Sequence, residues 1–404
     1  MRCRQPLLLL LCLLFCQPGW AQVAPESAEK YNAGQALYEK RRYQQALQAF
    51  EEAVKLDGNN AQAYRGMAKT YQKLKDSDKA IANFRMATTV KPDYVEAHYE
   101  LGNFFYNLKR YKDAQAAFKA VVNLDGDFQN GNARNLLKAA YSRHGRDHLL
   151  RKNYRKAIEE YENATQLDPT DATNYYNLGL AAKQARKYKQ AENAFTTAVE
   201  LNPTYAKAHR QLGDLYRLTK RNSRAIRSYG RAIDSDPNCK DRKNINAYRN
   251  LAVVFNRTKQ YSRAVSTLRK AVAVAPTTKD KVRIYAALGH SHALGKNYKS
   301  AVSAYQQALA LDSRDSEAQY RAAVAYFELK QYQNALNYAR RAARDRRYGV
   351  PAYVIMGDVY DAWRPQGWKE KAIQNYSRGL RDRKFKKYCE DKIDRIKNPV
   401  DTGE

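Results

Sequence analysis

A repeat of close to 34 residues constrains this sequence more than any single residue does. Within Ala172–Tyr205, small and large apolar residues recur at intervals of three and four residues in two successive segments. The two sets are Tyr175, Leu178, Gly179 and Ala182, followed by Ala191, Phe195, Ala198 and Leu201. This is the period of a half-buried helix, and Pro203 ends the second one. Because two such helices cannot bury their apolar faces alone, the repeat predicts a stack of helix pairs.

The same pattern recurs along most of the chain, in about ten units of close to 34 residues. The landmarks are an aromatic residue, Leu-Gly, a second aromatic or small residue, then Ala, an aromatic residue, Ala and Pro. They resemble the tetratricopeptide repeat (TPR) family. The resemblance implies an all-α fold, a right-handed superhelical solenoid of helix-turn-helix pairs with a C-terminal capping helix.

The register of the landmarks divides the chain into segments. Repeats 1–3 occupy residues 27–128, and repeats 4–10 occupy residues 138–383. An insertion at 129–137 separates them and is the expected position of a bend between two lobes. A capping helix is expected at 385–397, because a solenoid must cover its last hydrophobic face. We expect residues 398–404 to form a disordered tail.

The first 21 residues have the pattern of a secretory signal peptide. Arg2 and Arg4 precede an apolar run from Leu7 to Cys16, and small residues permit cleavage after Ala21. The run is too short to span a bilayer. We therefore expect an exported protein, periplasmic in the first place, and otherwise secreted or in the lumen of a secretory pathway.

Cysteine usage agrees with a scaffold that needs no disulfides. Three of the five cysteines lie in the signal segment. Cys239 and Cys389 are more than four repeats apart, which is too far for a disulfide between stacked helices. Both are expected to be structural thiols, and their lack of pairing favours a bacterial periplasm. Asn163, Asn256 and Asn375 lie in glycosylation sequons, so a eukaryotic origin stays open.

The sequence predicts no enzyme. It contains no phosphate-binding loop, no metalloprotease motif and no paired CxxC. His144 and His148 have the four-residue spacing that can place two imidazoles on one metal ion. They also occupy core landmarks, so we interpret them as partly buried core residues. Neither a metal site nor a cofactor site is predicted.

Charge and the TPR resemblance together predict a binding groove. Lys and Arg number 72 against 41 Asp and Glu, a formal charge of +31. In the TPR family the first helix of each unit lines a concave groove, through about its second, fifth, ninth and twelfth residues. In the central repeats these offsets are Lys207, Arg210, Arg217, Asn246, Arg249, Asn256, Arg257, Arg283 and His290. A secondary groove in the N-terminal repeats would have Tyr31, Tyr38, Arg65, Lys69, Lys73, Tyr99, Asn103 and Tyr106.

Rows of arginine suit carboxylates or phosphates, because the planar guanidinium makes bidentate hydrogen bonds. The first hypothesis is a noncatalytic protein-protein interaction scaffold that docks an acidic or extended peptide and helps to assemble an envelope or secretion complex. The alternative is a binder of anionic polymers or membrane surfaces through its net positive charge. A third possibility is a noncatalytic subunit that positions an enzyme's substrate. The signal peptide argues against nucleic acid as the normal partner.

Overall fold

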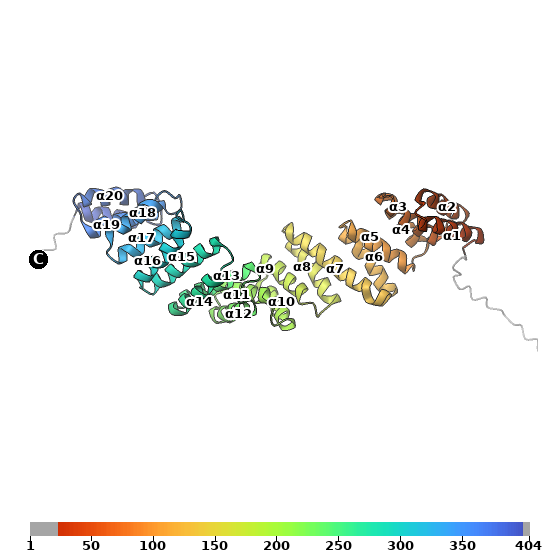
Figure 1. Cartoon of the computed structure of the whole chain (residues 1–404), viewed down its shortest axis with the longest axis horizontal. Coiled ribbons are helices and arrows are strands. Elements are labelled where there is room, and N and C mark those ends of the chain that lie inside the picture. The colour runs from red at the N-terminus through yellow and green to blue at the C-terminus, as the bar shows by residue number, and fades with distance from the viewer. Residues whose placement is uncertain (1–22, 399–404) are drawn as a thin grey trace, which may run out of the picture. The chain divides into compact units, whose positions relative to one another are not determined.

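The computed structural model describes residues 23–398, and these are all-α: 21 α-helices, one short 3₁₀-helix and no strand. The signal segment 1–21 and residues 399–404 of the predicted tail lie outside the described residues. Compactness divides the chain into two units, residues 1–169 and 170–404. Each unit is a series of helix pairs, labelled in Figure 1. The boundary between them lies one repeat beyond the insertion at 129–137, where we expected a bend.

The N-terminal unit contains four helix pairs. Their bounds are α1 Pro25–Glu39 with α2 Tyr43–Leu56, α3 Ala61–Lys73 with α4 Ser77–Val90, α5 Val95–Asn107 with α6 Tyr111–Leu124, and α7 Phe128–Leu150 with α8 Tyr154–Leu167. The two helices of each pair pack on each other, and each pair packs on the next. The apolar stripes of these helices are therefore buried within the unit.

The C-terminal unit contains six further pairs and a last helix. The bounds are α9 Ala172–Gln184, α10 Tyr188–Leu201, α11 Ala206–Leu218, α12 Asn222–Ser235, α13 Ile245–Arg257, α14 Tyr261–Val274, α15 Thr278–Leu294, α16 Tyr298–Leu311, α17 Ser316–Glu328, α18 Tyr332–Ala342, α19 Gly349–Trp363, α20 Trp368–Gly379 and α21 Lys386–Lys397. The final helix, α21, packs on α20 and buries Cys389 and Ile396. It lies where the capping helix was predicted. Cys239 and Cys389 are both free and buried.

The core of each unit is built from the predicted landmarks. Most second helices bury one aromatic ring almost completely: Phe50, Phe84, Phe118, Tyr161, Phe195, Tyr229, Tyr305 and Tyr376. In most pairs the ring lies against a glycine of the first helix. At Gly213, for example, a Cβ atom would lie 2.5 Å from the ring of Tyr229. Any larger residue would therefore push the two helices apart.

The turn within each helix pair has a cation in the left-handed region of backbone space; nine of these turns have three residues, and the turn between α19 and α20 has four. The ten residues are Arg41, Lys75, Lys109, Lys152, Arg186, Lys220, Lys259, Lys296, Lys330 and Arg364, with φ between 52° and 63°. Glycine is the usual residue in this region, because it has no Cβ. Several successive turn residues are 34 positions apart, which reproduces the repeat period in the backbone.

Three of the intervals between these turns are longer than 34 positions, and one of them, the 37 positions from Lys259 to Lys296, contains the 17-residue helix α15. Lys109 and Lys152 are 43 positions apart, and the extra residues lengthen α7, whose backbone is non-helical at residues 129–131. Lys220 and Lys259 are 39 positions apart, and here the extra residues form the 3₁₀-helix Arg242–Asn244. In this 3₁₀-helix, the side-chain amide of Asn244 donates hydrogen bonds to the backbone carbonyls of Ala232 and Asp236. These bonds hold the inserted loop against α12.

Replacing Gly213 with alanine should destabilise the protein by about 1–3 kcal/mol, because the new methyl group overlaps the buried Tyr229 ring. Gly230 of the partner helix α12 is the matched control, since a Cβ there meets no atom within 4 Å. Gly230→Ala should instead stabilise by about 0.5–1 kcal/mol through helix propensity. Equilibrium urea unfolding followed by circular dichroism measures both changes. Two stabilising substitutions would show that the glycine–ring contact does not set the helix spacing.

Candidate binding faces of the two units

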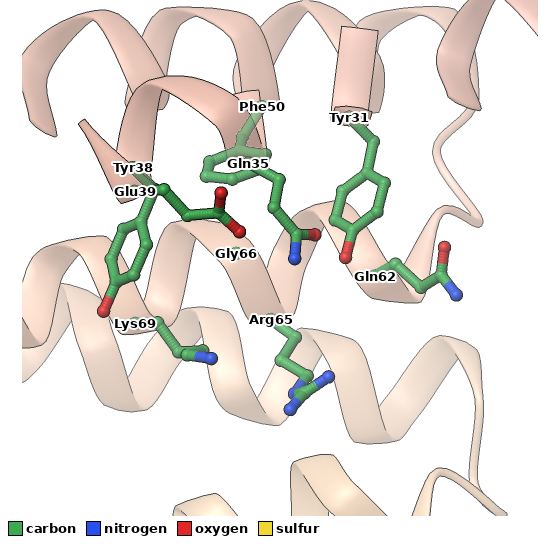
Figure 2. A pocket seen from close by; sticks show the side chains of 9 residues that line it. All are labelled: Tyr31, Gln35, Tyr38, Glu39, Phe50, Gln62, Arg65, Gly66 and Lys69. Carbon is green, nitrogen blue, oxygen red and sulfur yellow. The ribbon is translucent and has the colours of Figure 1, made fainter. Parts of the chain in front are cut away.

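A hollow of about 200 Å³ lies between α1 and α3 in the N-terminal unit. Figure 2 shows the side chains of α1 pointing toward those of α3, with Phe50 behind them. The lining residues are Tyr31, Gln35, Tyr38, Glu39, Phe50, Gln62, Arg65, Gly66 and Lys69. Phe50 is buried between Gly34 and Gly66, which have no side chain to displace its ring. The hollow thus has an aromatic floor and a polar rim.

The two cations of this hollow, Arg65 and Lys69, lie near one carboxylate of the next helix pair, that of Glu100. Glu100 on α5 accepts two hydrogen bonds from the Arg65 guanidinium, at 2.7 and 2.6 Å. This carboxylate raises the pKa of Arg65 further above its ordinary value. Lys69 Nζ lies 3.8 Å from Glu100 and 5.8 Å from the ring centre of Tyr38. The secondary groove therefore has a mixed polar and aromatic character, with little uncompensated positive charge.

In the C-terminal unit, the first helices α11, α13, α15 and α17 contact one another in series. We call the surface that they share the first-helix face. A hollow of about 300 Å³ lies in it between α15 and α17, and its lining includes His290, Tyr320, Arg321 and Glu328. Side chains of successive helices therefore lie side by side along this face.

Several predicted cations of the first-helix face are held by neighbouring residues. Arg210 is 5% exposed and donates to Asp241 at 2.8 Å. Arg217 donates to the hydroxyl of Tyr229, which in turn donates to Asp214. His290 Nδ1 is 2.9 Å from the guanidinium of Arg321, and burial lowers the pKa of His290. Arg321 also pairs with Glu317. Of the three predicted residues, Arg210 has a carboxylate partner, whereas Arg217 and His290 have their hydrogen bonds with the Tyr229 hydroxyl and the Arg321 guanidinium.

Arg249 differs from these residues. Its guanidinium is half-buried, and its single hydrogen bond within residues 23–398 goes to the Asn246 amide oxygen at 3.3 Å. Its Nε atom is buried without a partner among the same residues. Burial, and next the charge of Arg283, lower the pKa of Arg249. Arg283 is exposed on α15 and forms no ion pair within the described part of the chain. Two neighbouring helices thus present two cations that lack a carboxylate.

Sequence comparison with known protein families identifies the same repeats that the helix pairs show in the structure. Sequence models of the tetratricopeptide repeat match residues 65–133, 176–238 and 287–349, and residues 243–314. A model described as the TPR repeat matches residues 34–75 and 145–185. Together these matches span most of the chain. The chain belongs to the tetratricopeptide repeat family.

Individual relatives are distant. The chain is 26% identical over 102 residues to "Protein STIP1 homolog" of Dictyostelium discoideum, covering 25% of this chain and 18% of that protein. It is 24% identical over 221 residues to mouse "Protein O-mannosyl-transferase TMTC3", covering 42% of this chain and 24% of that protein. The chain thus spans at most 24% of the length of these two relatives.

A solved structure agrees at the level of the fold. The C-terminal part of a TPR repeat-containing protein from Cytophaga hutchinsonii has a TM-score of 0.50 and 19% identity. The match covers 62% of this chain and 98% of that structure.

Among residues 23–398, no helix combines the length and the apolar character that a membrane span requires.

The other predicted TPR groove residues also lie on first helices. In the C-terminal unit Lys207 is exposed, Asn256 donates to Ser291 Oγ, and Arg257 donates to the carbonyl of Arg217. In the N-terminal unit the hollow contains Tyr31, Tyr38, Arg65 and Lys69. The remaining four are not among its lining residues. Lys73 is exposed on α3, and Tyr99, Asn103 and Tyr106 follow one face of α5, where Tyr99 accepts a hydrogen bond from Asn132.

The sequence reasoning missed the acids that neutralise these cations. Glu100 is the sixth residue of its first helix, between the offsets used to choose groove residues. Asn250 and Arg321 have the same sixth position in their units, and they too reach the preceding first helix, at Asp214 and His290. Asp241 comes from the insertion between repeats, to which no offset applies. The sixth position is the signal that would have found Glu100.

Arg210→Met should destabilise the protein by about 1–3 kcal/mol, because it leaves Asp241 partly buried without its cation. Arg283→Met is the matched control, and should change stability by no more than about 0.5 kcal/mol, since Arg283 is exposed. The free energy of unfolding from urea titration tests both. Equal effects of the two substitutions would contradict the division into paired and unpaired arginines.

Proposed function

We propose that this TPR protein is a noncatalytic protein-protein interaction scaffold that docks an acidic or extended peptide on the first-helix face of its C-terminal unit. The observation that carries the proposal is Arg249, a half-buried guanidinium on which the positive charge of Arg283 acts and which forms no ion pair with a carboxylate among the described residues. A buried charge without a partner is costly. A carboxylate supplied by a ligand would remove that cost and form charge-assisted hydrogen bonds.

The spacing of the first helices suits an extended ligand. Packed helices are about 8–10 Å apart, and a peptide extended in the polyproline II conformation advances about 3.1 Å per residue with three residues per turn, so every third side chain lies on the same side. Every third residue of an extended peptide therefore meets the next helix. A peptide with glutamate at every third position would place carboxylates opposite α13 and α15 together. Lys207 on α11 offers a further cation for the same ligand.

The TPR relative named as a transferase does not change this proposal. Its match covers 24% of that protein, so the likeness concerns a part of it. The features of the first-helix face described above are charge, amides and hydrogen-bonded aromatic hydroxyls, which are suited to recognition.

A labelled twelve-residue peptide with glutamate at every third position tests the docking proposal. The double variant Arg249→Gln/Arg283→Gln should bind it at least about tenfold more weakly, because one charge-assisted hydrogen bond contributes ~1.5–3 kcal/mol and tenfold is ~1.4 kcal/mol. Arg231→Gln/Lys270→Gln is the control, with the same change of charge at exposed residues of the second helices α12 and α14. Fluorescence anisotropy at two salt concentrations gives the affinities.

A second peptide with the same composition but four consecutive glutamates tests the spacing, and should bind more weakly than the first. Equal losses in both double variants, with equal affinity for the two peptides and for inorganic polyphosphate, would contradict peptide docking. That result would favour the alternative, a binder of anionic polymers or membrane surfaces through net charge.

We also propose that the protein acts after export from the cytoplasm, with the periplasm as the first expected compartment, in assembly of an envelope or secretion complex. The support is the sequence of residues 1–21. When the chain is expressed in a bacterium with residues 1–21 retained, we expect to recover it from the periplasmic fraction. N-terminal sequencing should then show Gln22 as its first residue. Recovery of uncleaved chain from the cytoplasm would contradict export.

A further inference from the structure

Two histidines and a glutamate converge in the last helix pair of the N-terminal unit. His144 and His148 lie on α7, and Glu160 lies on α8. The three can offer one ligand atom each such that all three atoms lie within 4.8 Å of one another. His144 Nδ1 is 2.9 Å from Glu160 Oε1, and the two imidazole centres are 4.4 Å apart. Two nitrogens and one oxygen therefore surround a single point.

The fold brings these groups together through general features of the helix pair. Residues four apart lie on the same side of a helix, which places both imidazoles over one turn of α7. Between them in sequence, Gly145 faces α8, where a Cβ atom would lie 3.2 Å from the Cβ of Glu160. The absence of a side chain at Gly145 thus lets α8 approach closely enough for Glu160 to reach the imidazoles.

A residue of the preceding helix pair orients the carboxylate. Gln115 on α6 donates to Glu160 Oε2 at 2.6 Å, so that oxygen is occupied and Oε1 faces His144. Outer partners of this kind commonly orient metal-binding carboxylates. The side chains of His144 and Glu160 are 20% and 14% exposed. The cluster is therefore partly shielded from water and still open to an ion.

The geometry points to a site for a divalent transition-metal ion of the zinc class, held by His144, His148 and Glu160. Zn²⁺ accepts imidazole nitrogen and carboxylate oxygen at about 2.0–2.2 Å, and three protein ligands leave its fourth position for water. The ion would lie between His144 Nδ1 and Glu160 Oε1 and replace the hydrogen bond that joins them. The proton of that hydrogen bond moves to the imidazole Nε2 or to solvent.

The surroundings limit how tightly such an ion would bind. Lys112, Arg151 and Lys156 are close enough to act electrostatically on His144, and Asp147 opposes them. We therefore expect weaker binding than at a closed four-ligand zinc site. A bound ion would link α7 to α8 and raise the melting temperature, since it binds the assembled three-ligand site more tightly than the separate side chains of the unfolded chain.

The test is calorimetric titration of the full mature chain, without an affinity tag, with Zn²⁺, accompanied by absorption spectroscopy with Co²⁺. We expect one equivalent of metal, a visible Co²⁺ ligand-field spectrum and a melting temperature that rises with metal. Glu160→Gln and His148→Gln should each weaken binding at least about tenfold, as loss of a direct ligand exceeds the effect of an outer one. His292→Gln is the control, a partly exposed histidine of the C-terminal unit outside the cluster.

Metal-free melting temperatures separate loss of a ligand from loss of the fold. If Glu160→Gln does not fold, His148→Gln decides the result, because His148 lacks the ion pair of His144 and Glu160. Wild-type binding no stronger than that of His148→Gln would overturn the site. So would a Co²⁺ spectrum that all variants share. Either outcome would leave His144 and Glu160 as a structural hydrogen-bonded pair.

Discussion

The contact between a glycine of the first helix and a buried ring of the second sets the geometry on which the rest of the structure depends. In seven pairs a Cβ at this glycine would lie 2.5–3.2 Å from a ring atom. The pairs therefore have a common spacing, and equivalent positions of successive first helices face the same side. The first-helix face follows from this regularity. So does the histidine cluster, because Gly145 is the same landmark in another pair.

The net charge of the chain says less about function than the question of which Lys and Arg side chains already pair with a carboxylate of the chain. Ten Lys and Arg residues occupy the left-handed turns within the helix pairs, where they add to the total of +31 and lie outside the helices. Others, such as Arg65 and Arg210, hold neighbouring helices or loops together through a carboxylate. The half-buried cations without a carboxylate partner among the described residues are therefore more informative than the total charge, and Arg249 is one of them.

The helix pairs and the buried landmarks were predictable from sequence, because a period of 34 residues repeats the same packing many times. Tyr229 and Phe195 are buried where the pattern places them. Contacts between repeats were not predictable in the same way. The offset rule considers one helix at a time, whereas Glu100 and Asn250 act on the helix before their own. His144 and His148 were recognised as a spaced pair, but Glu160 lies on the other helix of the hairpin and has no signal in the spacing.

Arg210 has a carboxylate partner and Arg249 has none among the described residues, and the difference lies in the loops that join successive helix pairs. After α12, the inserted residues place Asp241 beside Arg210, and Asp236 accepts from two backbone amides of the same loop to hold it there. After α14, the first acid along the chain is Asp280 in the first turn of α15. Its carboxylate instead accepts a hydrogen bond from Thr277, and its backbone amide donates to the Thr277 hydroxyl, which caps the helix. Asp280 therefore acts on Arg249 only through space, and the guanidinium has no carboxylate partner among the described residues.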